Sequence, residues 1–541
     1  MGDAVARGGD GLVFALRDLL ERWVAAPLRG LAGPQGMTGE PDELGRDPWP
    51  GDARRGEALL ARRDELLRRL TETEVENVDD EWLVRLHGFD WLRDLRALGG
   101  DDARRLAREA VQTWIDHAQQ LPSAVTRADV AGARVAAWVG NWSFFALRAD
   151  DAFRIRMMTS LVRQARRLPG GWARAPAGSP RIAALHGLAV AGATFEGAER
   201  WIQQASTGLQ RELAHQVLPD GGHIERSPGR QLAVLLRLVD VRALLVRRSM
   251  PVPERLRTAI EALAGMLRFY RHGDGGLALF NGSDEGDAGT IDLLLAQAGK
   301  TRATPTASDT GFERARAGKA LLILDAGAPP PAGFDGNAHA GTLSFEFSVG
   351  RERLIVNCGH HDAPAPAWRV SSRATAAHST VTIDDTNSSE ISDGRIGRRA
   401  RIVERDRRED TGSIWIDVAH DGYRLTHDIV HRRRLYLQDT GRDLRGEDAI
   451  EGPAGHRFQA RFHLHPDVKA SLVQEGSAVL LRLPSGNGWR FRATGGRVGL
   501  SESVYLGRRG EVRRTEQIVI EGETGEGGAR LRWAIQAVER R

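Results

Sequence analysis

The sequence predicts a multidomain protein of α-then-β class, with a helical N-terminal part followed by a C-terminal part of β-strands. Three observations support this class. Before residue 305 apolar residues recur every three or four positions, and after it the chain turns to short alternating runs. Between the two, Lys300–Thr310 is polar and small, as linkers are. We therefore expect a lead-in segment over residues 1–56, a helical domain over 57–304 and a sheet domain over 305–541.

Eight segments of the helical domain carry an apolar face, which is the pattern of amphipathic helices. Breaks such as Pro169-Gly-Gly and Pro251-Val-Pro separate them. Helices of this length joined by short loops pair as hairpins and wind into a toroid or solenoid, and an ordinary helical bundle stays open because no repeat period is evident. The predicted helices are Leu59–Leu70, Asp102–Leu121, Ala131–Leu147, Phe153–Leu168, Arg181–Ala193, Trp201–Gln216, Gln231–Val246 and Glu254–Tyr270, with Leu12–Leu28 in the lead-in segment.

Short alternating runs fill the sheet domain, and turn signals such as Ser-Gly-Asn-Gly at 485–488 separate them. Runs of this kind predict a sandwich of β-strands. The predicted strands are Ala320–Asp325, Leu343–Val349, Leu354–Asn357, Thr380–Ile383, Ser413–Val418, Leu435–Asp439, Val479–Leu483, Trp489–Arg492 and Arg530–Ile535.

The charged residues exclude one class of partner. Lysine and arginine total 76 against 72 acids, which gives a net charge of +4, and almost all of the bases are arginine. The acids are interspersed with the bases, and no element combines clustered bases with exposed aromatics, so no nucleic acid is expected as a partner. Arginine suits bidentate pairing with carboxylates or sulfates wherever several arginines face one cleft.

Neither a disulfide nor a membrane anchor is expected. Cys358 is the only cysteine, which excludes an intramolecular disulfide and leaves the redox compartment open. The first residues lack the charged and apolar regions of a signal peptide, and no run of about 18 apolar residues occurs. We therefore expect no transmembrane segment and no visible secretory leader.

The most informative stretch runs from Asn337 to Asn387. Its alternating and β-branched runs predict strands, and residues able to bind a metal or handle protons stand at or near their ends. Residues placed in this way gather at one rim of a sheet. They are His339, Cys358 and His378.

Together with Asp220-Gly-Gly-His-Ile-Glu-Arg-Ser-Pro228, this stretch resembles the heparinase II/III-like superfamily of polysaccharide lyases and its relatives among the alginate lyases. The resemblance implies an (α/α) toroid of helical hairpins packed on an antiparallel β-sandwich, with a cleft between them. It also implies β-elimination beside a uronic acid, in which one group neutralises the carboxylate, a base takes the C5 proton and an acid protonates the leaving oxygen.

In the first segment the family pattern has a tyrosine and a histidine shortly after Ser-Pro, and the tyrosine carries the proton. This chain has Arg230 and Gln231 there, and a guanidinium cannot act as a base at neutral pH. His223 and Arg226 are therefore our catalytic candidates in this segment, with Glu225 and Arg230 as substrate-binding residues. The alternative is that His223 and Arg226 cap a helix and hold the loop.

The neutralising asparagine of the family has no obvious counterpart in Gly178–His186. Arg181 in that segment and Asn141, in a turn between helices, are the candidates that replace it in binding substrate. An asparagine in such a turn is more often a helix cap. The glycine-rich loop with Asp274 and Asn281 is expected to border the cleft.

In the sheet domain the family carries His-x-His-x-Asp, and here Asn337 replaces the first, catalytic histidine while His339 retains the second, which binds a metal. By the same resemblance His378 is the third ligand, and the metal-binding aspartate falls at Asn357, beside Cys358. We expect either one structural Zn²⁺ on His339, Cys358 and His378, a weaker site with Asn357, or a metal-free rim. Asn337 is taken as a substrate-binding residue.

Tyr423 is our third catalytic candidate, because some alginate-lyase relatives use a tyrosine of the sandwich as the proton donor. A packed strand residue is the alternative. Tyr505 has no comparable sequence setting, and His420, His427 and His431 are interpreted as surface residues.

Two functions remain open on these residues. One is a carbon–oxygen lyase that cleaves an acidic, uronate-containing polysaccharide by β-elimination. The other is a non-catalytic glycan-binding or cell-envelope polysaccharide assembly protein on the same scaffold, which the substituted catalytic positions favour. The partner is an acidic polysaccharide in both, and a homodimer stays open. The resemblance implies the cell envelope or periplasm, whereas the visible N-terminus implies the cytoplasm.

Overall fold

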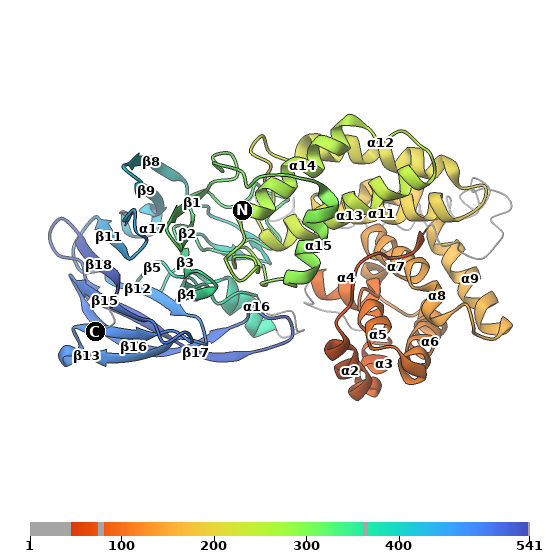
Figure 1. Ribbon diagram of the computed structural model, residues 1–541, viewed down its shortest axis with the longest axis horizontal. Coiled ribbons are helices and arrows are strands. Elements are labelled where there is room, and N and C mark those ends of the chain that lie inside the picture. Colours follow the sequence, from red (N-terminus) through yellow and green to blue (C-terminus); the bar gives the residue numbers. More distant parts are fainter. Residues whose placement is uncertain (1–44, 74–79, 361–365, 539–541) are drawn as a thin grey trace, which may run out of the picture.

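Helices and strands occupy two different parts of the molecule in this computed structural model, as Figure 1 shows. The structure describes residues 45–73, 80–360 and 366–538. The helix expected at Leu12–Leu28 lies outside the described residues. Within them, helices precede strands along the chain, which confirms the predicted fold class of a helical toroid followed by an antiparallel β-sandwich.

The helical part is organised around α11 (Ser179–Thr194), which is buried along nearly its whole length and packs against α7, α12 and α13. Small residues allow the close approach, since a Cβ atom on Gly187 would lie 2.3 Å from the Cα atom of Gly132 in α7. The other helices of this part are α2 (Ala53–Ala61), α3 (Arg63–Arg69), α4 (Asp80–Gly88), α5 (Leu92–Leu98), α6 (Gly100–His117), η2 (Ser123–Thr126), α7 (Ala128–Gly140), α8 (Trp142–Phe145), α9 (Asp151–Ala165), α10 (Leu168–Gly171), η3 (Trp172–Arg174), α12 (Glu199–Gln216), α13 (Pro228–Arg247), α14 (Glu254–Phe269) and α15 (Ala288–Ala298).

The sheet part is a sandwich of two eight-stranded antiparallel sheets. The first has the order β1-β2-β3-β4-β12-β17-β16, with β5 also paired to β12, and the second has the order β13-β14-β15-β18-β11-β10-β9-β8. Their inner faces enclose one apolar core that includes Phe345, Phe462 and Trp533. The strands are β1 (Phe312–Ala317), β2 (Ala320–Asp325), β3 (Phe345–Val349), β4 (Glu352–Val356), β5 (Val381–Ile383), β6 (Ile391–Ser392), β7 (Arg395–Ile396), β8 (Ile402–Asp410), β9 (Ser413–Tyr423), β10 (Ile429–Leu437), β11 (Asp443–Glu451), β12 (Arg457–Leu464), β13 (Lys469–Val473), β14 (Ala478–Arg482), β15 (Gly488–Thr494), β16 (Arg497–Tyr505), β17 (Arg513–Glu523) and β18 (Ala529–Ala537), with the short helices α16 (Pro366–Arg373), η4 (Thr375–Ala377), α17 (Arg424–His427) and η5 (Gln474–Gly476) between them.

An apolar contact joins the two parts. The core of the helices continues into Phe312 of β1 and Leu321 and Ile323 of β2, which are buried in the same cluster. The ring of Phe312 meets Tyr270 edge to face, with centroids 5.2 Å apart. The first two strands therefore face the helices as well as the sandwich, and the helices and the sandwich share one continuous interface.

No helix among the described residues has the length and apolar character that crossing a bilayer requires.

Candidate functional site

The two segments that carry the family resemblance lie next to each other at the junction of helices and sandwich. Asn281, from the loop between α14 and α15, connects them: its Nδ2 donates to the carbonyl oxygen of Arg226 at 2.9 Å, and its Oδ1 accepts the backbone N–H of His339 at 3.0 Å. Ser283 of the same loop adds a further contact to the first segment, because its Oγ accepts the N–H of Gly229 at 2.9 Å. The loop and the histidine rim are therefore in contact through Asn281.

His223 holds the loop rather than presenting a ring to a substrate. The side chain is buried, its Nε2 lies 2.9 Å from Oε1 of Gln216, and its Nδ1 accepts the N–H of Glu225 at 3.4 Å. Burial lowers the pKa of His223, so the ring is neutral with its proton on Nε2. These contacts support the structural alternative, and the catalytic role of His223 stays a prediction.

Arg226 fastens the helical part to the sandwich. Its guanidinium donates to the carbonyl oxygens of Thr310 and Ala328, both at 2.5 Å, and forms an ion pair with Asp325 at 2.5 Å. The same group lies 4.8 Å from the ring centre of Phe312. Four hydrogen bonds, including one to the carbonyl oxygen of Gly311, give Arg226 an interdomain role, and its catalytic role stays a prediction.

Tyr423 lies in the apolar core of the sandwich. The side chain is fully buried and its hydroxyl donates to the carbonyl oxygen of Val381 at 2.7 Å. Burial raises the pKa of Tyr423, and a hydroxyl enclosed in this way has no access to a glycan. Burial and this hydrogen bond support the packed-strand alternative, and the role as proton donor stays a prediction.

The nearby histidines also differ from the expectation of surface residues. His420 and His431 are fully buried, and Nε2 of His431 lies 2.8 Å from Oδ1 of Asp448. Of the three, only His427 keeps some exposure. The alternation of inward and outward positions along β9 and β10 could have predicted that His420 and His431 are buried, because both occupy inward-facing positions.

Glu225 lies beside the N-terminus of α11, and Arg230 lies in the first turn of α13. Oε1 of Glu225 accepts the N–H of Ser179 at 2.5 Å, which caps the first turn of α11 with a negative charge. Its Oε2 is 3.8 Å from Nε of Arg230. The carboxylate thus orients one arginine at the head of α13, and the substrate-binding role of both residues stays a prediction.

Asn141 and Arg181 lie on the helices instead of facing one another across a cleft. Nδ2 of Asn141 donates to the carbonyl oxygen of Ala137 at 2.8 Å where α7 ends, so the residue caps that helix, as the alternative reading held. Arg181 donates to the carbonyl oxygen of Ala175 at 3.2 Å, and its Nη1 is 3.4 Å from Oε1 of Glu212. Both side chains have protein partners, and the substrate-binding role of Asn141 and Arg181 stays a prediction.

Three arginines form a cationic cluster beside this junction, and two of them were missed from the sequence. Arg230 and Arg237 lie seven residues apart on α13 and therefore share a helix face, and Arg93 of α5 faces them. Burial lowers the pKa of Arg237; Asp90 counteracts that effect, whereas Arg230 and Arg93 add to it. Arg93 pairs with Asp47.

Arg237 differs from its two neighbours in its partners. Its guanidinium donates to the carbonyl oxygen of Ala233 at 3.2 Å, and no carboxylate in the described part of the chain forms an ion pair with it. The half-buried side chain therefore keeps donors for an anionic ligand.

At the rim, His339 and His378 form a pair with defined protonation. Nδ1 of His378 lies 2.8 Å from the carbonyl oxygen of Ala374 and must donate to it, so its Nε2 accepts from Nδ1 of His339 at 3.0 Å. Burial lowers the pKa of His378 to about 4 and that of His339 well below its usual value. His339 is thus left with a lone pair on Nε2, which has no hydrogen-bond partner among the described residues. Asn337 is half-buried and packs against the turn at Gly282, and Nε2 of His339 lies beside the same turn.

Cys358 does not lie with this pair, so the zinc set of His339, Cys358 and His378 finds no support in this geometry and stays a prediction. Its Sγ faces Nδ1 of His463 at 3.5 Å, and burial raises the pKa of the thiol to about 12, which disfavours a thiolate ligand. Among the described residues the ligand atoms of these three do not converge within 4.8 Å. Asn357, the weaker substitute, bonds to Glu346 and to the N–H of Ser379.

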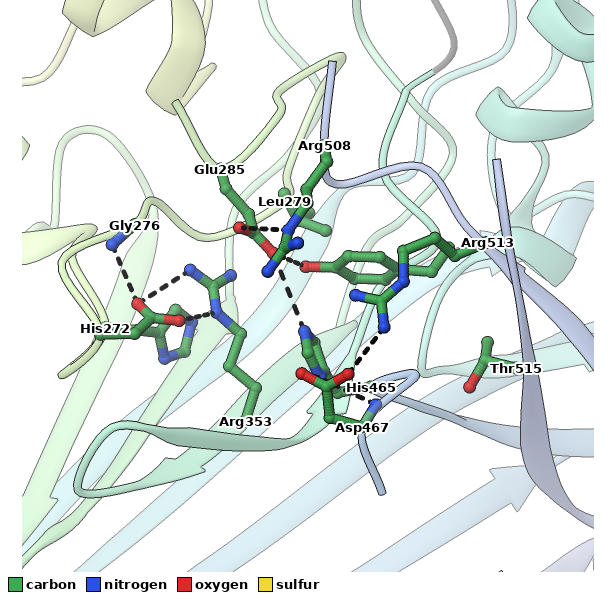
Figure 2. A network of polar contacts seen from close by, with 12 residues as sticks. His272, Gly276, Leu279, Glu285, Arg353, His465, Asp467, Arg508, Arg513 and Thr515 are labelled. Carbon is green, nitrogen blue, oxygen red and sulfur yellow. Dashed lines mark hydrogen bonds and ion pairs between the residues drawn. The ribbon is translucent and has the colours of Figure 1, made fainter. Parts of the chain in front are cut away.

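A second polar cluster at the junction was not found from the sequence, and Figure 2 shows it from close by. The hydroxyl of Tyr505 donates to Oε1 of Glu285, from the loop before α15, and Nε2 of His465 lies 3.8 Å from the same oxygen. In the same network Arg353 of β4 donates to Asp274 at 2.7 and 3.1 Å. Burial raises the pKa of Tyr505 well above its usual value, so the phenol remains a donor to the carboxylate.

Comparison with family models agrees with this architecture. Residues 68–269 match the model described as heparinase II/III N-terminus, and residues 299–534 match the model described as heparinase II/III-like, C-terminal. Among curated proteins, the chain is 32% identical over 546 residues to FtsZ-localized protein C of Caulobacter vibrioides (strain NA1000 / CB15N), covering 94% of this chain and 92% of that protein.

Solved structures share the fold at low sequence identity. Heparinase III superimposes with a TM-score of 0.69 at 15% identity, over 99% of this chain and 93% of its own. The heparan sulfate lyase HepC of Pedobacter heparinus gives a TM-score of 0.58 at 19% identity, over 93% and 86%. These likenesses establish the arrangement of helices and sandwich.

Proposed function

Because this chain belongs to the heparinase II/III-like family, we propose that it binds an acidic, uronate-containing glycan where its helices meet its sandwich. The observation that carries the proposal is the cationic cluster of Arg93, Arg230 and Arg237, in which Arg237 forms no ion pair among the described residues. Guanidinium groups recognise carboxylates and sulfates through paired hydrogen bonds. The cluster borders the loop that contacts the His339 rim.

Binding without cleavage is the better supported form of this function. β-Elimination needs a base and an acid free to exchange protons with the sugar. His223 and Arg226 are engaged by buried protein partners, Tyr423 is enclosed in the core, and Tyr505 donates to Glu285. The residues that would transfer protons therefore have other roles in this arrangement.

A binding titration with heparan sulfate, alginate and hyaluronan tests the proposal. The wild-type protein should bind at least one of these polymers, and added salt should weaken the binding. Arg237→Gln should lower the affinity roughly tenfold or more, because it removes a charge-assisted contact. Arg211→Gln, an exposed arginine on α12, is the matched control and should bind as wild type does. Equal affinity of both variants and wild type, or no binding to any of the polymers, would contradict the proposal.

Cleavage by β-elimination is the second candidate, and one observation favours it. Nε2 of His339 carries a lone pair without a hydrogen-bond partner among the described residues, so it is the one group of the rim left to accept a proton; it is buried, and a substrate would have to displace the groups that cover it. Incubation with the same polymers, with the absorbance of the unsaturated product followed over time, measures cleavage by β-elimination directly. A signal that is present in wild type and lost in His339→Gln supports a lyase, and an absent signal with retained binding supports the binding protein.

The curated relative suggests a cellular setting for either function. Its name describes localisation with FtsZ, and the similarity extends over 94% of this chain. We extend that localisation to this protein as a proposal. A fluorescent fusion imaged together with FtsZ in the host cell should give overlapping signals, and a signal independent of FtsZ would contradict it.

A further inference from the structure

A group of two histidines and one aspartate stands in the sandwich, apart from the rim and the cationic cluster. Asp384 follows β5, His427 belongs to α17 and His456 precedes β12. One potential ligand atom from each lies within 4.8 Å of the others, which is true of no other such group among the described residues. β5 and β12 belong to one sheet, whereas α17 connects two strands of the other, so the three residues meet where the two sheets approach each other.

We propose that Asp384, His427 and His456 bind one Zn²⁺ ion that links the two sheets of the sandwich. Imidazole and carboxylate groups are ligands that Zn²⁺ accepts, and three protein ligands leave a fourth position for water. This set shares no residue with His339, Cys358 and His378, the zinc site that the family resemblance implied.

The distances suit a tetrahedral ion after a small adjustment. Oδ2 of Asp384 is 2.7 Å from Nδ1 of His456 and 3.6 Å from Nε2 of His427. Ligands about 2.1 Å from Zn²⁺ lie roughly 3.4 Å apart in a tetrahedron. The ion would therefore replace the proton shared by His456 and Asp384 and separate those two atoms slightly.

Surrounding groups orient the three ligands. The N–H of Arg457 donates to Oδ1 of Asp384 at 2.8 Å, which leaves Oδ2 to face the histidines. Oγ1 of Thr426 lies 2.7 Å from Nδ1 of His427, so a proton on Nδ1 has an acceptor and Nε2 can present its lone pair. The backbone N–H of His456 donates to Oγ1 of Thr524 at 3.0 Å, which fixes His456 at the start of β12.

The site is also accessible. The side chains of Asp384, His427 and His456 are 32%, 10% and 25% exposed, so an ion can enter from solvent and keep a water ligand. Asp384 adopts a left-handed backbone conformation with φ of 45°, which aspartate and asparagine tolerate better than most residues. Asp384→Asn is therefore a conservative test of the carboxylate.

The experiment is a calorimetric titration of the full-length protein, stripped of metal with a chelator, with zinc chloride. We expect one equivalent to bind and the melting temperature to rise with zinc concentration. Co²⁺ in place of Zn²⁺ should give the visible absorption of a tetrahedral ion. Asp384→Asn, His427→Gln and His456→Gln should each weaken binding about 100-fold or more, while their metal-free melting temperatures and circular dichroism stay close to wild type.

Two further variants make the result specific. His215→Gln removes an exposed histidine of α12, and His339→Gln removes the histidine of the rim; both should keep one equivalent of zinc. The proposal is overturned if no zinc binds, if zinc binding survives in the three site variants, or if it is lost in His339→Gln alone.

Discussion

Asp274 illustrates how a single partly buried charge sets the behaviour of this protein. The carboxylate accepts two hydrogen bonds from Arg353 and one from the N–H of Gly276 at 2.9 Å. Burial by itself would raise the pKa of Asp274, but the Arg353 guanidinium outweighs that effect and holds the pKa at about 2. An aspartate in the unfolded chain titrates near 3.9, so the ionised carboxylate stabilises the folded state.

The pH dependence of this contribution has a defined direction. Because the folded-state pKa is depressed, the stabilisation is present above about pH 4 and is lost as the pH falls through 2. Asp274→Asn should therefore reduce the free energy of unfolding by about 2 kcal/mol at neutral pH, and the difference from wild type should shrink between pH 4 and pH 2. Urea unfolding of both proteins at a series of pH values measures this difference in unfolding free energy. A difference that does not change with pH would contradict the role assigned to the ionised Asp274.

The roles of individual residues were the least predictable part of the sequence. Arg226 and Tyr505 bind partners 84 and 220 positions away, and partners so distant leave no local pattern. The residues around His223 match the family motif, but the role of His223 depends on its burial, and burial follows from how the loop packs in the fold. The i, i+7 spacing of Arg230 and Arg237 was readable, but their meeting with Arg93 required the fold.

Among the secondary-structure elements, several with a regular buried face were predicted, but β1 and β11 were missed although each of them buries a face. α12 and α14 appear where the 3.6-residue period placed them, and β2 matches its predicted range. β8 was missed because it lies at a sheet edge with little buried surface, so its residues do not alternate. The predicted helix Ala131–Leu147 is interrupted at Asn141, which ends α7.

The loop before α13 depends on close backbone packing at one glycine. A Cβ atom on Gly222 would lie 1.7 Å from Oγ1 of Thr310, in the segment that leads into β1. Gly222→Ala should therefore destabilise the protein by about 1–3 kcal/mol, because loop and strand must separate to admit the methyl group.

Gly229→Ala is the matched control for that substitution. Its Cβ atom would meet Oγ of Ser283 at 3.4 Å, an ordinary contact, and alanine favours the helix by up to about 1 kcal/mol. Denaturant unfolding of both variants measures how much each substitution changes the free energy of unfolding. Similar destabilisation by the two would show that glycine flexibility, and not the contact with Thr310, is what matters.

The whole molecule behaves as one unit because its halves are joined by buried polar and apolar contacts. Arg226 donates into the sandwich, Glu285 accepts from Tyr505, and Phe312 packs into the helical core. The overall architecture was the most predictable property, since the change of periodicity near residue 305 and two short motifs were sufficient to infer it.

Cooperative unfolding is the consequence that calorimetry can measure. Wild type should melt in a single transition, and Arg226→Ala should lower the melting temperature and separate the two halves, since it leaves Asp325 buried without its partner at a cost of about 3–5 kcal/mol. Arg497→Ala removes an exposed ion pair with Glu521 and should cost at most about 1 kcal/mol. An Arg226→Ala protein that melts as Arg497→Ala does would rule out this coupling.

The packing of β1 and β2 on the helices also determines where the gene can be divided. A cut at residue 304, where the sequence changes character, would strip Phe312 and Ile323 from the helical fragment and leave it with an open apolar patch. A cut after Ala326 would keep both strands with the helices and remove only the outermost pair from the first sheet. Soluble expression of the longer N-terminal fragment is accordingly the more promising route to studying the helices alone.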